Sequence, residues 1–490
     1  MSKTIADILP AVAEREPGKT ALVEGDRRLS YGDLWMRVKA LSGTLRRRGI
    51  ETGGRVALLL PNGIDFVVAY FASVTAGAVV VPLNDGYQET ELEYFTRLCG
   101  VSLVVTSRRH ESLCLRVLGE DSGLGRVFFM EDWAFDPSGR NAIGSDWVLA
   151  DNPVMFQFSS GSTGQPKRIA RRHANLLFEL ERFTAMLAIR PEDRFLGVAP
   201  FSHVNGLMRS MMASVYAGAT LFPLERFERQ RAAETIERER LTVMIAVPFM
   251  FGMLAKSRFS RPPDFSSLRL CISASAPMPK NLNLEFHAKF GRFVRQLYGS
   301  TETGTISVNL EPDPAGSLES VGVPLSGVSV EVVSESGSPL PADQMGEIVV
   351  RSPAAITGYE DLPEVNRETF RDGAFLTGDL GRKDPAGRLY LMGRKKFFIN
   401  KGGYKINPQE IETLLEQHPD VEEVAVVGVP TQFEDEKVKA VVVRKGAVDA
   451  DQLVEFCRGR IADFKIPAVI EFRDSLPKSS TGKIRKKLLI

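Results

Sequence analysis

The chain has 490 residues, a hydrophobic share of 43% and a charged share of 25%, as in a soluble globular enzyme. Its 62 lysines and arginines nearly balance 61 aspartates and glutamates, so neither nucleic acid nor an anionic membrane surface is an expected partner. Because such a chain is too long for one ordinary core, we expect at least two domains.

The N-terminus, the longest apolar run and the cysteines bear on location. Residues 1–7 lack the apolar core that a signal peptide needs. The apolar run 66–81 is shorter than the roughly 20 residues that span a bilayer, and polar residues interrupt it. The four cysteines form no Cys-x-x-Cys pair, so neither a disulfide framework nor a zinc site is expected. We therefore expect a cytoplasmic protein without a membrane span.

Short apolar strands alternate with helices through the first part of the chain. A helix at 34–48 precedes a strand at 55–60, and run 66–81 predicts a buried helix that turns at Gly77 into a strand. This alternation is typical of an α/β fold with parallel sheets buried on both faces. Further strands are predicted at 103–106, 127–130, 243–247 and 268–273, with a charged, solvated helix at 226–240.

The pattern changes from about Glu319. Alternating runs at 328–333 and 347–350, broken by glycine and proline, predict an antiparallel β section. A boundary follows near residues 393–396. Beyond it, a helix around Ile411 and Leu415, strands at 424–429 and 438–443, and a helix at 451–461 predict a small α+β unit.

Residues 158–167, Phe-Ser-Ser-Gly-Ser-Thr-Gly-Gln-Pro-Lys, concentrate hydroxyls and glycines before one lysine. Glycines let the backbone approach an anion, the hydroxyls donate hydrogen bonds, and Lys167 adds charge. The segment is not a Walker A loop, because Gln165 and Pro166 separate Gly164 from the lysine. We predict a phosphate-binding loop, and a surface linker is the alternative.

Two carboxylates occupy similarly polar segments. Glu302 lies among the hydroxyls and glycines of 296–304, where it suits Mg²⁺ beside ATP phosphates, while Thr301 suits a phosphate oxygen. Asp379 follows an apolar run, and its two oxygens suit adjacent ribose hydroxyls, with Arg394 in reach of the same sugar or phosphate. Simple turns, with Glu302 in solvent, are the alternative for both segments.

A histidine and a C-terminal lysine complete the candidate groups. His203 lies between an apolar strand and a Met-rich helix at 207–212, which favours a pocket wall over the structural role more usual for a lone histidine. Lys483 lies in a basic tail, 476–487, and suits stabilisation of charge on a transferring phosphoryl group. Disorder is the alternative for this tail.

Taken in this order, the segments resemble the adenylate-forming superfamily, which includes acyl-CoA synthetases, the adenylation domains of non-ribosomal peptide synthetases and firefly luciferase. The resemblance covers essentially the whole chain. It implies an α/β fold: a large N-terminal domain of α/β sheets plus a β section, with a small mobile α+β C-terminal lid domain. The N-terminal domain, 1–392, would bind ATP and the acid, with a hinge at 393–396 and the lid at 397–490.

The resemblance also implies roles for individual residues. The catalytic residues would be Lys483, Thr301, Glu302 and His203, with Glu302 as the Mg²⁺ ligand and Lys396 as the hinge. ATP would be bound by Ser159, Ser160, Gly161, Ser162, Thr163, Gly164, Lys167, Tyr298, Gly299, Asp379 and Arg394. The acid pocket would comprise His203, Met208, Ser273, Ala274 and Ser275, and the thiol tunnel Lys401, Gly402 and Gly403.

The implied chemistry is that of an AMP-forming acid–thiol ligase using ATP, Mg²⁺ and CoA. A carboxylate attacks the α-phosphorus of ATP, pyrophosphate leaves, and a thiol then displaces AMP to form a thioester. Positioning and charge stabilisation perform most of this catalysis. A ligase that passes the adenylate to a phosphopantetheinyl acyl carrier protein is one alternative, and a non-catalytic nucleotide-binding module is another.

Several positions depart from the family pattern. Arg168 replaces a glycine, and with Arg171 and Arg172 we expect it to form a solvated face; contact with phosphates of CoA or an acidic carrier protein is the alternative. Segment 273–277, Ser-Ala-Ser-Ala-Pro, replaces a more glycine-rich stretch that lines the acid pocket. Its extra methyl groups would narrow that pocket.

The histidine segment bears on the acid itself. Ser202 and Val204 are neutral where amino-acid-activating relatives place an acidic residue, so we predict an acid without an α-amine. Met208, with Met211 and Met212, suggests an adaptable apolar pocket, although methionines at this spacing are usually core. We expect Arg209 to face outward; pairing with a second carboxylate of a dicarboxylic acid is the alternative.

Overall fold

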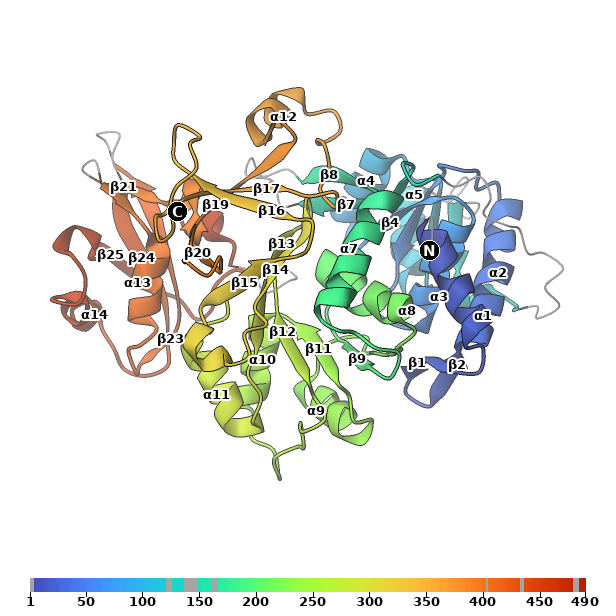
Figure 1. Cartoon of the computed structure of the whole chain (residues 1–490), viewed down its shortest axis with the longest axis horizontal. Coiled ribbons are helices and arrows are strands. Elements are labelled where there is room, and N and C mark those ends of the chain that lie inside the picture. The colour runs from blue at the N-terminus through green and yellow to red at the C-terminus, as the bar shows by residue number, and fades with distance from the viewer. Residues whose placement is uncertain are drawn as a thin grey trace.

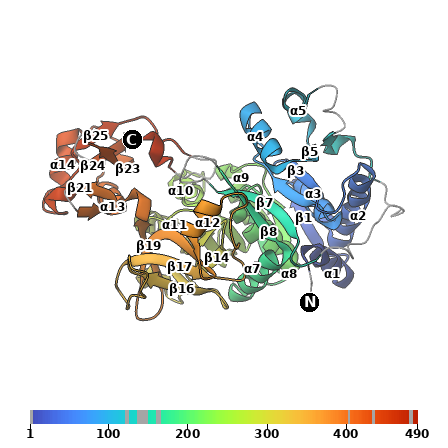
Figure 2. The same ribbon diagram turned by 90° about the horizontal axis from the view of Figure 1, so that it is seen from above.

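The computed structural model describes residues 4–119, 126–135, 149–159, 166–401, 404–431, 436–478 and 484–490, with only the backbone described for residues 159, 396, 400, 404 and 405. Figures 1 and 2 show the C-terminal unit, in orange and red, at the end of the molecule opposite the blue N-terminal segments. The predicted α/β class, with a large N-terminal part and a smaller C-terminal unit, is confirmed.

The first sheet has six strands in the order β6-β5-β3-β4-β7-β8. All neighbours are parallel except β7 and β8, which form an antiparallel hairpin. Sequence reasoning missed this hairpin, which joins the two ends of the predicted phosphate loop. The bounds are β3 (Arg55–Leu59), β4 (Val79–Pro82), β5 (Leu103–Thr106), β6 (Val127–Phe129), β7 (Pro153–Ser159) and β8 (Lys167–Arg172).

The second sheet runs from parallel strands into antiparallel ones. Its main path is β16-β17-β19-β20-β15-β14-β13-β12-β11-β9-β10-β1-β2, with β18 beside β19. The parallel section comprises β1 (Thr20–Glu24), β10 (Thr220–Pro223), β9 (Arg194–Gly197), β11 (Val243–Ala246), β12 (Leu270–Ser273) and β13 (Arg295–Ser300), with β2 (Arg27–Ser30) antiparallel at its edge.

The antiparallel section begins earlier than the sequence pattern predicts. Strand β14 (Gly304–Val308) already pairs antiparallel with β13, so the change occurs before Glu319. The polar nucleotide motif obscured this strand, because its first residues belong to that motif. The other strands are β15 (Ser320–Pro324), β16 (Ser329–Val333), β17 (Gly346–Arg351), β18 (Phe370–Arg371), β19 (Ala374–Lys383) and β20 (Leu389–Arg394).

A layer of helices lies between the two sheets. Helix α3 (Ile64–Thr75) is buried at every position except Asp65, as its continuous apolar sequence predicts. Its side chains share one core with both sheets. The helices around this core are α1 (Ile8–Arg15), α2 (Tyr31–Arg47), α7 (His173–Met186), the π-helix η5 (Asn205–Met212) and α8 (Ala213–Ala217).

The outer faces of the sheets have separate cores. Helices α4 (Glu89–Cys99) and α5 (Glu111–Leu118) cover the first sheet. The second is covered by α9 (Arg229–Arg238), α10 (Pro248–Lys256) and α11 (Lys280–Phe290), and α12 (Pro363–Thr369) precedes β18. Among the described residues, no helix combines the length and apolar character that crossing a bilayer requires.

The C-terminal unit has its own core. Strands β23 (Val421–Pro430), β24 (Glu436–Arg444) and β25 (Val469–Phe472) form one sheet, and β21 (Ile399–Lys401) pairs with β22 (Tyr404–Ile406). Helices α13 (Pro408–Leu415) and α14 (Ala450–Cys457) pack on the core that includes Ile411 and Leu415.

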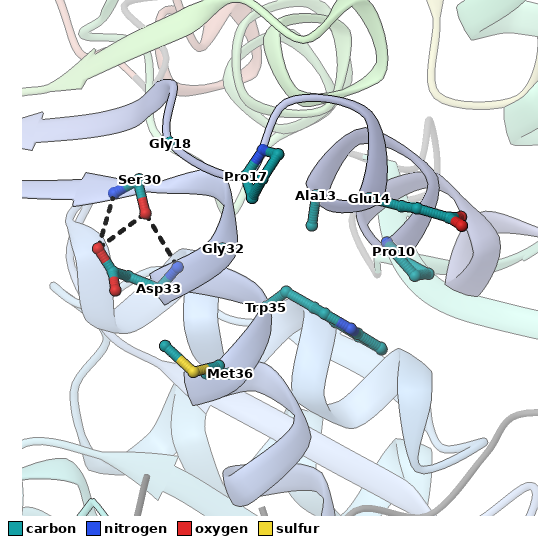
Figure 3. Close-up of a pocket in the computed structure, with 10 residues that line it drawn as sticks. All are labelled: Pro10, Ala13, Glu14, Pro17, Gly18, Ser30, Gly32, Asp33, Trp35 and Met36. Atoms are coloured by element: carbon teal, nitrogen blue, oxygen red, sulfur yellow. Dashed lines mark hydrogen bonds between the residues drawn. The ribbon is translucent and has the colours of Figure 1, made fainter.

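A surface pocket between α1 and α2 is set apart from the predicted site. It is lined by Pro10, Ala13, Trp35 and neighbouring residues, none of which belongs to the predicted ATP or acid site. Figure 3 shows Ser30 at its edge, where the serine hydroxyl accepts a hydrogen bond from the Asp33 amide at 3.1 Å and caps α2.

A buried histidine makes stability depend on pH. Nδ1 of His173, at the start of α7, accepts a hydrogen bond from the Ile5 amide at 3.1 Å. Burial lowers the pKa of His173 from 6.5 to about 4, against the opposing charge of Asp7. Because the pKa of His173 in the folded protein is below its ordinary value, folding is stabilised by the neutral imidazole. This stabilisation is complete above the ordinary pKa of histidine. It is lost as the pH falls through the folded pKa.

We expect His173→Asn to flatten this dependence, because an amide oxygen accepts the same bond without titrating. The native chain should lose about 2–3 kcal/mol between neutral pH and about pH 4, and the variant should lose less. Urea unfolding midpoints at the two pH values measure the difference. His418→Asn in the C-terminal unit is the control, and equal slopes for His173→Asn and the native chain would contradict the assignment.

Candidate active site

The carboxylate of Asp379 links its own strand, β19, to β20 and to β13. It lies in β19 opposite Arg394 of β20, and its Oδ1 accepts from Arg394 Nε at 2.6 Å. Its Oδ2 accepts from the Tyr298 hydroxyl of β13, also at 2.6 Å. Three predicted ATP-binding residues from distant parts of the sequence therefore share one carboxylate.

The electrostatics of this group fix its protonation states. Burial, with Asp379 as the next cause, raises the pKa of Tyr298 well above its ordinary value, so the phenol remains a donor. Burial acts to lower the pKa of the Arg394 guanidinium, but Asp379, together with Tyr298 and Glu302, raises it above its ordinary value. The aromatic ring of Tyr298 is buried, whereas the Arg394 side chain is 46% exposed.

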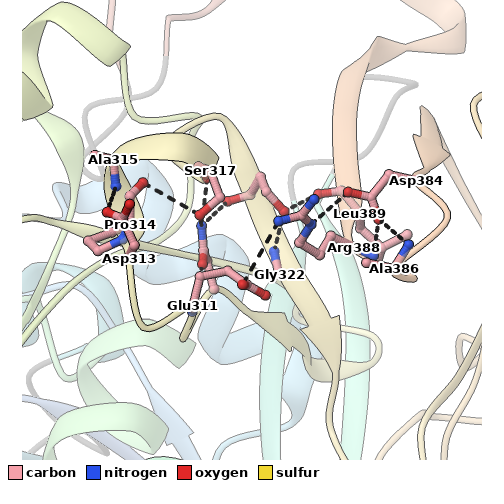
Figure 4. Close-up of polar contacts among 12 residues, drawn as sticks. Glu311, Asp313, Pro314, Ala315, Ser317, Gly322, Asp384, Ala386, Arg388 and Leu389 are labelled. Atoms are coloured by element: carbon pink, nitrogen blue, oxygen red, sulfur yellow. Dashed lines mark hydrogen bonds and ion pairs between the residues drawn. The ribbon is translucent and has the colours of Figure 1, made fainter.

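A polar cluster fixes the other end of the β19–β20 hairpin (Figure 4). Asp384 in the hairpin turn accepts from Arg388 Nε at 2.6 Å and from the Ala386 amide at 3.0 Å. Ser320 of β15 donates to the Leu389 carbonyl at 2.9 Å. These bonds hold β20 against β15 and so set the position of Arg394 at the far end of the strand.

Glu302 lies in the turn between β13 and β14 and is only 8% exposed, so the alternative that its side chain lies in solvent is wrong. Its Oε1 accepts from the Tyr359 hydroxyl at 2.9 Å, and its carbonyl accepts from the Ile356 amide at 2.9 Å. Burial and then Glu302 raise the pKa of Tyr359. Tyr359 is a site residue that sequence reasoning missed, because a lone tyrosine in a loop carries no motif.

Lys167 lies beside this carboxylate. Its ammonium is 4.5 Å from the centre of the Tyr359 ring, a cation–π distance. Burial lowers the pKa of Lys167, and the Glu302 charge opposes that effect. The first residue of β8 and the β13–β14 turn, from different sheets, therefore meet at one place.

The basic segment after Lys167 does not form the solvated face that we expected. Arg171 is fully buried, and it ion-pairs with Glu179 of α7 at 3.0 Å and donates to the Thr301 carbonyl at 2.9 Å. Arg168 is held by the Leu98 carbonyl and by the Glu360 and Asp361 carboxylates. Arg172 alone is exposed. The alternation of β8 points Ile169 and Arg171 to one buried face.

Arg209 is likewise buried, at 2% exposure, so the outward orientation expected for it is wrong. It lies in η5, so the predicted Met-rich helix is a π-helix, and its Nε donates to Thr305 Oγ1 at 3.0 Å. Burial lowers the pKa of Arg209 to about 10; the charge of Glu179 opposes this effect, and the charge of Arg171 adds to it. The guanidinium therefore stays protonated at neutral pH.

Glu179 is the second residue that sequence reasoning missed. It accepts from the backbone and side chain of Thr305, each at 2.9 Å, and from Arg171. A signal was present, since Leu176, Glu179 and Phe183 follow helical spacing on the apolar face of α7.

The predicted acid-pocket residues lie at and after the end of β12, and before and within η5. Ser273 ends β12 beside β11, and Asn205 of η5 contacts the β11 carbonyl of Ala246 through its Nδ2 at 3.4 Å. Ser273 Oγ and Asn205 Oδ1 are buried without a hydrogen-bond partner among the described residues. Met208 packs in the central core, His203 is half-buried and Ala274 is buried.

Some predicted residues fall outside the described part of the chain. They are Ser160, Gly161, Ser162, Thr163, Gly164, Gly402, Gly403 and Lys483, and the side chains of Ser159 and Lys396 are also outside it. Lys401 is described, and its ammonium donates to the Phe464 carbonyl at 2.9 Å.

The fold and these groups define an adenylate-forming enzyme of the acid–thiol ligase class. The model of the AMP-binding enzyme family matches residues 9–360, and that of the AMP-binding enzyme C-terminal domain matches residues 410–483. The chain belongs to the AMP-binding enzyme family, as the sequence resemblance predicted.

Relatives match along nearly the whole chain. A feruloyl-CoA synthase from Amycolatopsis sp is 34% identical, over 97% of this chain and 96% of its own. A long-chain-fatty-acid–CoA ligase from Bacillus subtilis is 30% identical, over 100% of this chain and 94% of its own. ATP-bound MatB from Rhodopseudomonas palustris superposes with a TM-score of 0.88 at 30% identity, covering 99% of this chain and 98% of its own.

Ser275 carries backbone strain that a glycine would relieve. Its φ is +75°, in the left-handed region, in the segment where the family pattern has more glycine. We expect Ser275→Gly to raise the free energy of unfolding by up to about 1 kcal/mol, because the strain outweighs the added freedom of the unfolded chain. Urea unfolding tests this. Ser102→Gly, at an exposed position, should instead lower stability, and a loss of stability in Ser275→Gly would contradict the strain.

Proposed function

We propose that this enzyme activates a carboxylic acid without an α-amine, using ATP to form an acyl-adenylate, and then forms a thioester with CoA. AMP and pyrophosphate are the other products. The observation that carries the proposal is the convergence of two carboxylate groups on β13 and the turn after it. Tyr298 donates to Asp379, which also accepts from Arg394, and four residues later Glu302 accepts from Tyr359 beside Lys167.

The Asp379 group would hold the nucleoside. Each of its oxygens accepts one hydrogen bond from the protein, and a carboxylate has further lone pairs for two ribose hydroxyls. Arg394, half exposed beside it, is available to the sugar or a phosphate. Tyr298 would lie against adenine, and Gly299 would belong to the same ATP site. A Cβ at Gly299 would lie 2.4 Å from the Gly304 carbonyl, so no larger residue fits this close strand approach.

Glu302 fits a Mg²⁺ ion. Its carboxylate is buried and, among the described residues, accepts one side-chain hydrogen bond, from the Tyr359 hydroxyl to Oε1. Mg²⁺ is usually held by one or two carboxylates plus phosphate oxygens. When bound, the ion would neutralise phosphate charge. Thr301, with its carbonyl fixed by Arg171, would donate to the α-phosphate.

The remaining roles concern charge and access. The loop 159–167, closed by the β7–β8 hairpin, would hold the phosphates that leave as pyrophosphate. Lys483 would stabilise charge on the α-phosphoryl group during attack by the acid. His203, Met208, Ser273, Ala274 and Ser275 would line the acid pocket.

One lysine cannot serve the first step and also leave room for the thiol, so a moving lid is part of the proposal. Residues 1–392 would form the N-terminal domain, 393–396 the hinge with Lys396, and 397–490 the lid. The separate core around Ile411 supports this division. Lys401, Gly402 and Gly403 would line the thiol tunnel after the lid turns.

CoA is the proposed acceptor because the relatives described above include two named for CoA products. The alternative acceptor is a phosphopantetheinyl carrier protein. Comparing thioester formation with free CoA and with holo carrier protein distinguishes the two.

We expect Lys483→Ala to lower acid-dependent pyrophosphate release about 10²–10³-fold, because the charge that assists phosphoryl transfer is removed. Thioester formation from a pre-formed acyl-adenylate should change far less, since the lysine has left the site by then. Lys445→Ala, an exposed lysine in the same unit, is the matched control. Native rates in Lys483→Ala would contradict the proposed role, and ATP binding without turnover by the native chain would favour a binding module.

We expect Glu302→Gln to raise the Mg²⁺ concentration needed for half-maximal pyrophosphate release by at least about tenfold, because a neutral amide is a weaker ligand for a hard cation. Tyr359→Phe removes the hydrogen bond but keeps the carboxylate, so its Mg²⁺ dependence should shift much less. Magnesium titrations of the three proteins measure the effect. Equal curves for Glu302→Gln and the native chain would exclude Glu302 as the ligand.

A further inference from the structure

Three buried charged residues lie between the histidine segment and the nucleotide segment. The side chains of Arg171 and Glu179 are 0% and 2% exposed, and Arg209 is 2% exposed. Arg171 Nη2 donates to Glu179 Oε2 at 3.0 Å. Glu179 Oε1 accepts from Thr305, whose hydroxyl in turn accepts from Arg209 Nε at 3.0 Å.

The charges of this network do not balance. Among the described residues, two guanidinium groups share one carboxylate, which leaves one positive charge on buried side chains. Glu179 bonds Arg171 directly, whereas Arg209 is linked to it through the neutral Thr305 hydroxyl. A buried charge is costly unless it is paired and hydrogen-bonded. The missing partner is therefore an anion.

Arg209 also has an unused donor. Among the described residues, no hydrogen-bond partner lies within reach of its Nη2, although this nitrogen is buried. It lies beside Gly299, since a Cβ added there would lie 2.6 Å from it. Nε of Arg171, in the same network, is likewise buried without a described partner, and each such donor in a folded protein calls for an explanation, such as a bound ligand.

The position of this donor suits an acid that binds beside the nucleotide. Arg209 lies on η5, six residues after His203, and its guanidinium meets the face of β13 at Gly299, next to Tyr298. The phenol of Tyr298 reaches the other way, to Asp379. An acid whose reacting carboxylate meets the α-phosphorus would extend from this strand toward η5.

We infer that the substrate is a dicarboxylic acid, and that Arg209 binds the carboxylate that does not react. Glu179 and Arg171 are positioning residues that hold Thr305 and, through it, the guanidinium of Arg209. This rests on the proposed function and names the substrate class of its acid site. The second carboxylate stays ionised through both steps, while the first loses its charge when it joins the α-phosphorus.

The test compares acids that differ in this one charge. Pyrophosphate release is measured with short straight-chain dicarboxylic acids, their half-amides and the monocarboxylic acids of equal length. We expect kcat/KM for the best dicarboxylic acid to exceed that of its half-amide at least about a hundredfold, because a site built for a polar group rejects analogues that lack it.

Arg209→Gln should remove that preference. The dicarboxylic acid should lose at least about a hundredfold in kcat/KM, while the half-amide changes less than about fivefold. Arg209→Lys should restore part of the preference, since it keeps the charge without the planar fork. Arg226→Gln, which changes an exposed arginine, is the control variant. Unchanged ATP affinity of Arg209→Gln shows that its fold is intact.

The outcomes separate this inference from the proposed function. Equal use of half-amides, or a parallel loss with both acids in Arg209→Gln, would overturn the dicarboxylate assignment and leave adenylation standing. No pyrophosphate release with any acid, despite ATP binding, would overturn both. A shift of preference toward monocarboxylic acids in Arg209→Gln would support the assignment.

Discussion

The hydrogen bonds from Tyr298 and Arg394 to Asp379 are the constraint on which the site depends. Strand β13 is parallel to β12 and antiparallel to β14, so it is where the two halves of the large sheet meet. Asp379 lies in the antiparallel half, on β19. Its carboxylate accepts from both halves at once, so a shift of either strand would break a charge-assisted bond near 2.6 Å. The nucleotide position is thereby fixed by sheet register.

The sequence predicts the parallel strands well, because strands buried on both faces are short continuous apolar runs. The run 103–106 coincides with β5, and 243–247 differs from β11 by one residue. The β7–β8 hairpin could not be predicted this way. Strand β8, Lys-Arg-Ile-Ala-Arg-Arg, places a fully buried arginine on its inner face, and hydropathy counts that position as solvent-exposed. The compensating carboxylate, Glu179, is brought there only by folding.

Buried charged residues of the candidate site were likewise beyond prediction from the sequence. The motifs indicate Tyr298, Glu302, Asp379 and Arg394, because glycine-bracketed carboxylates and aromatic residues leave a local pattern. Their partners leave none: Tyr359 is a lone loop residue, and Arg209 is one charge in a methionine-rich helix. Burial of a charge depends on what the rest of the chain supplies around it, and single-sequence reasoning has no access to that. The prediction that Arg209 faces outward was wrong for this reason.

A buried network with an odd charge is a poor way to stabilise a fold, since apolar residues of similar size would serve as well or better. It is an effective way to select a ligand. Thr305 of β14 accepts from Arg209 and donates to Glu179, and it pairs with Gly299 of β13, so the hairpin that presents Tyr298 to the nucleotide is tied to the guanidinium. An acid that supplies the missing anion would satisfy both the orphaned Nη2 and the unbalanced charge. Its reacting carboxylate would then be oriented by a group that takes no part in the chemistry, which is how remote binding energy lowers a reaction barrier.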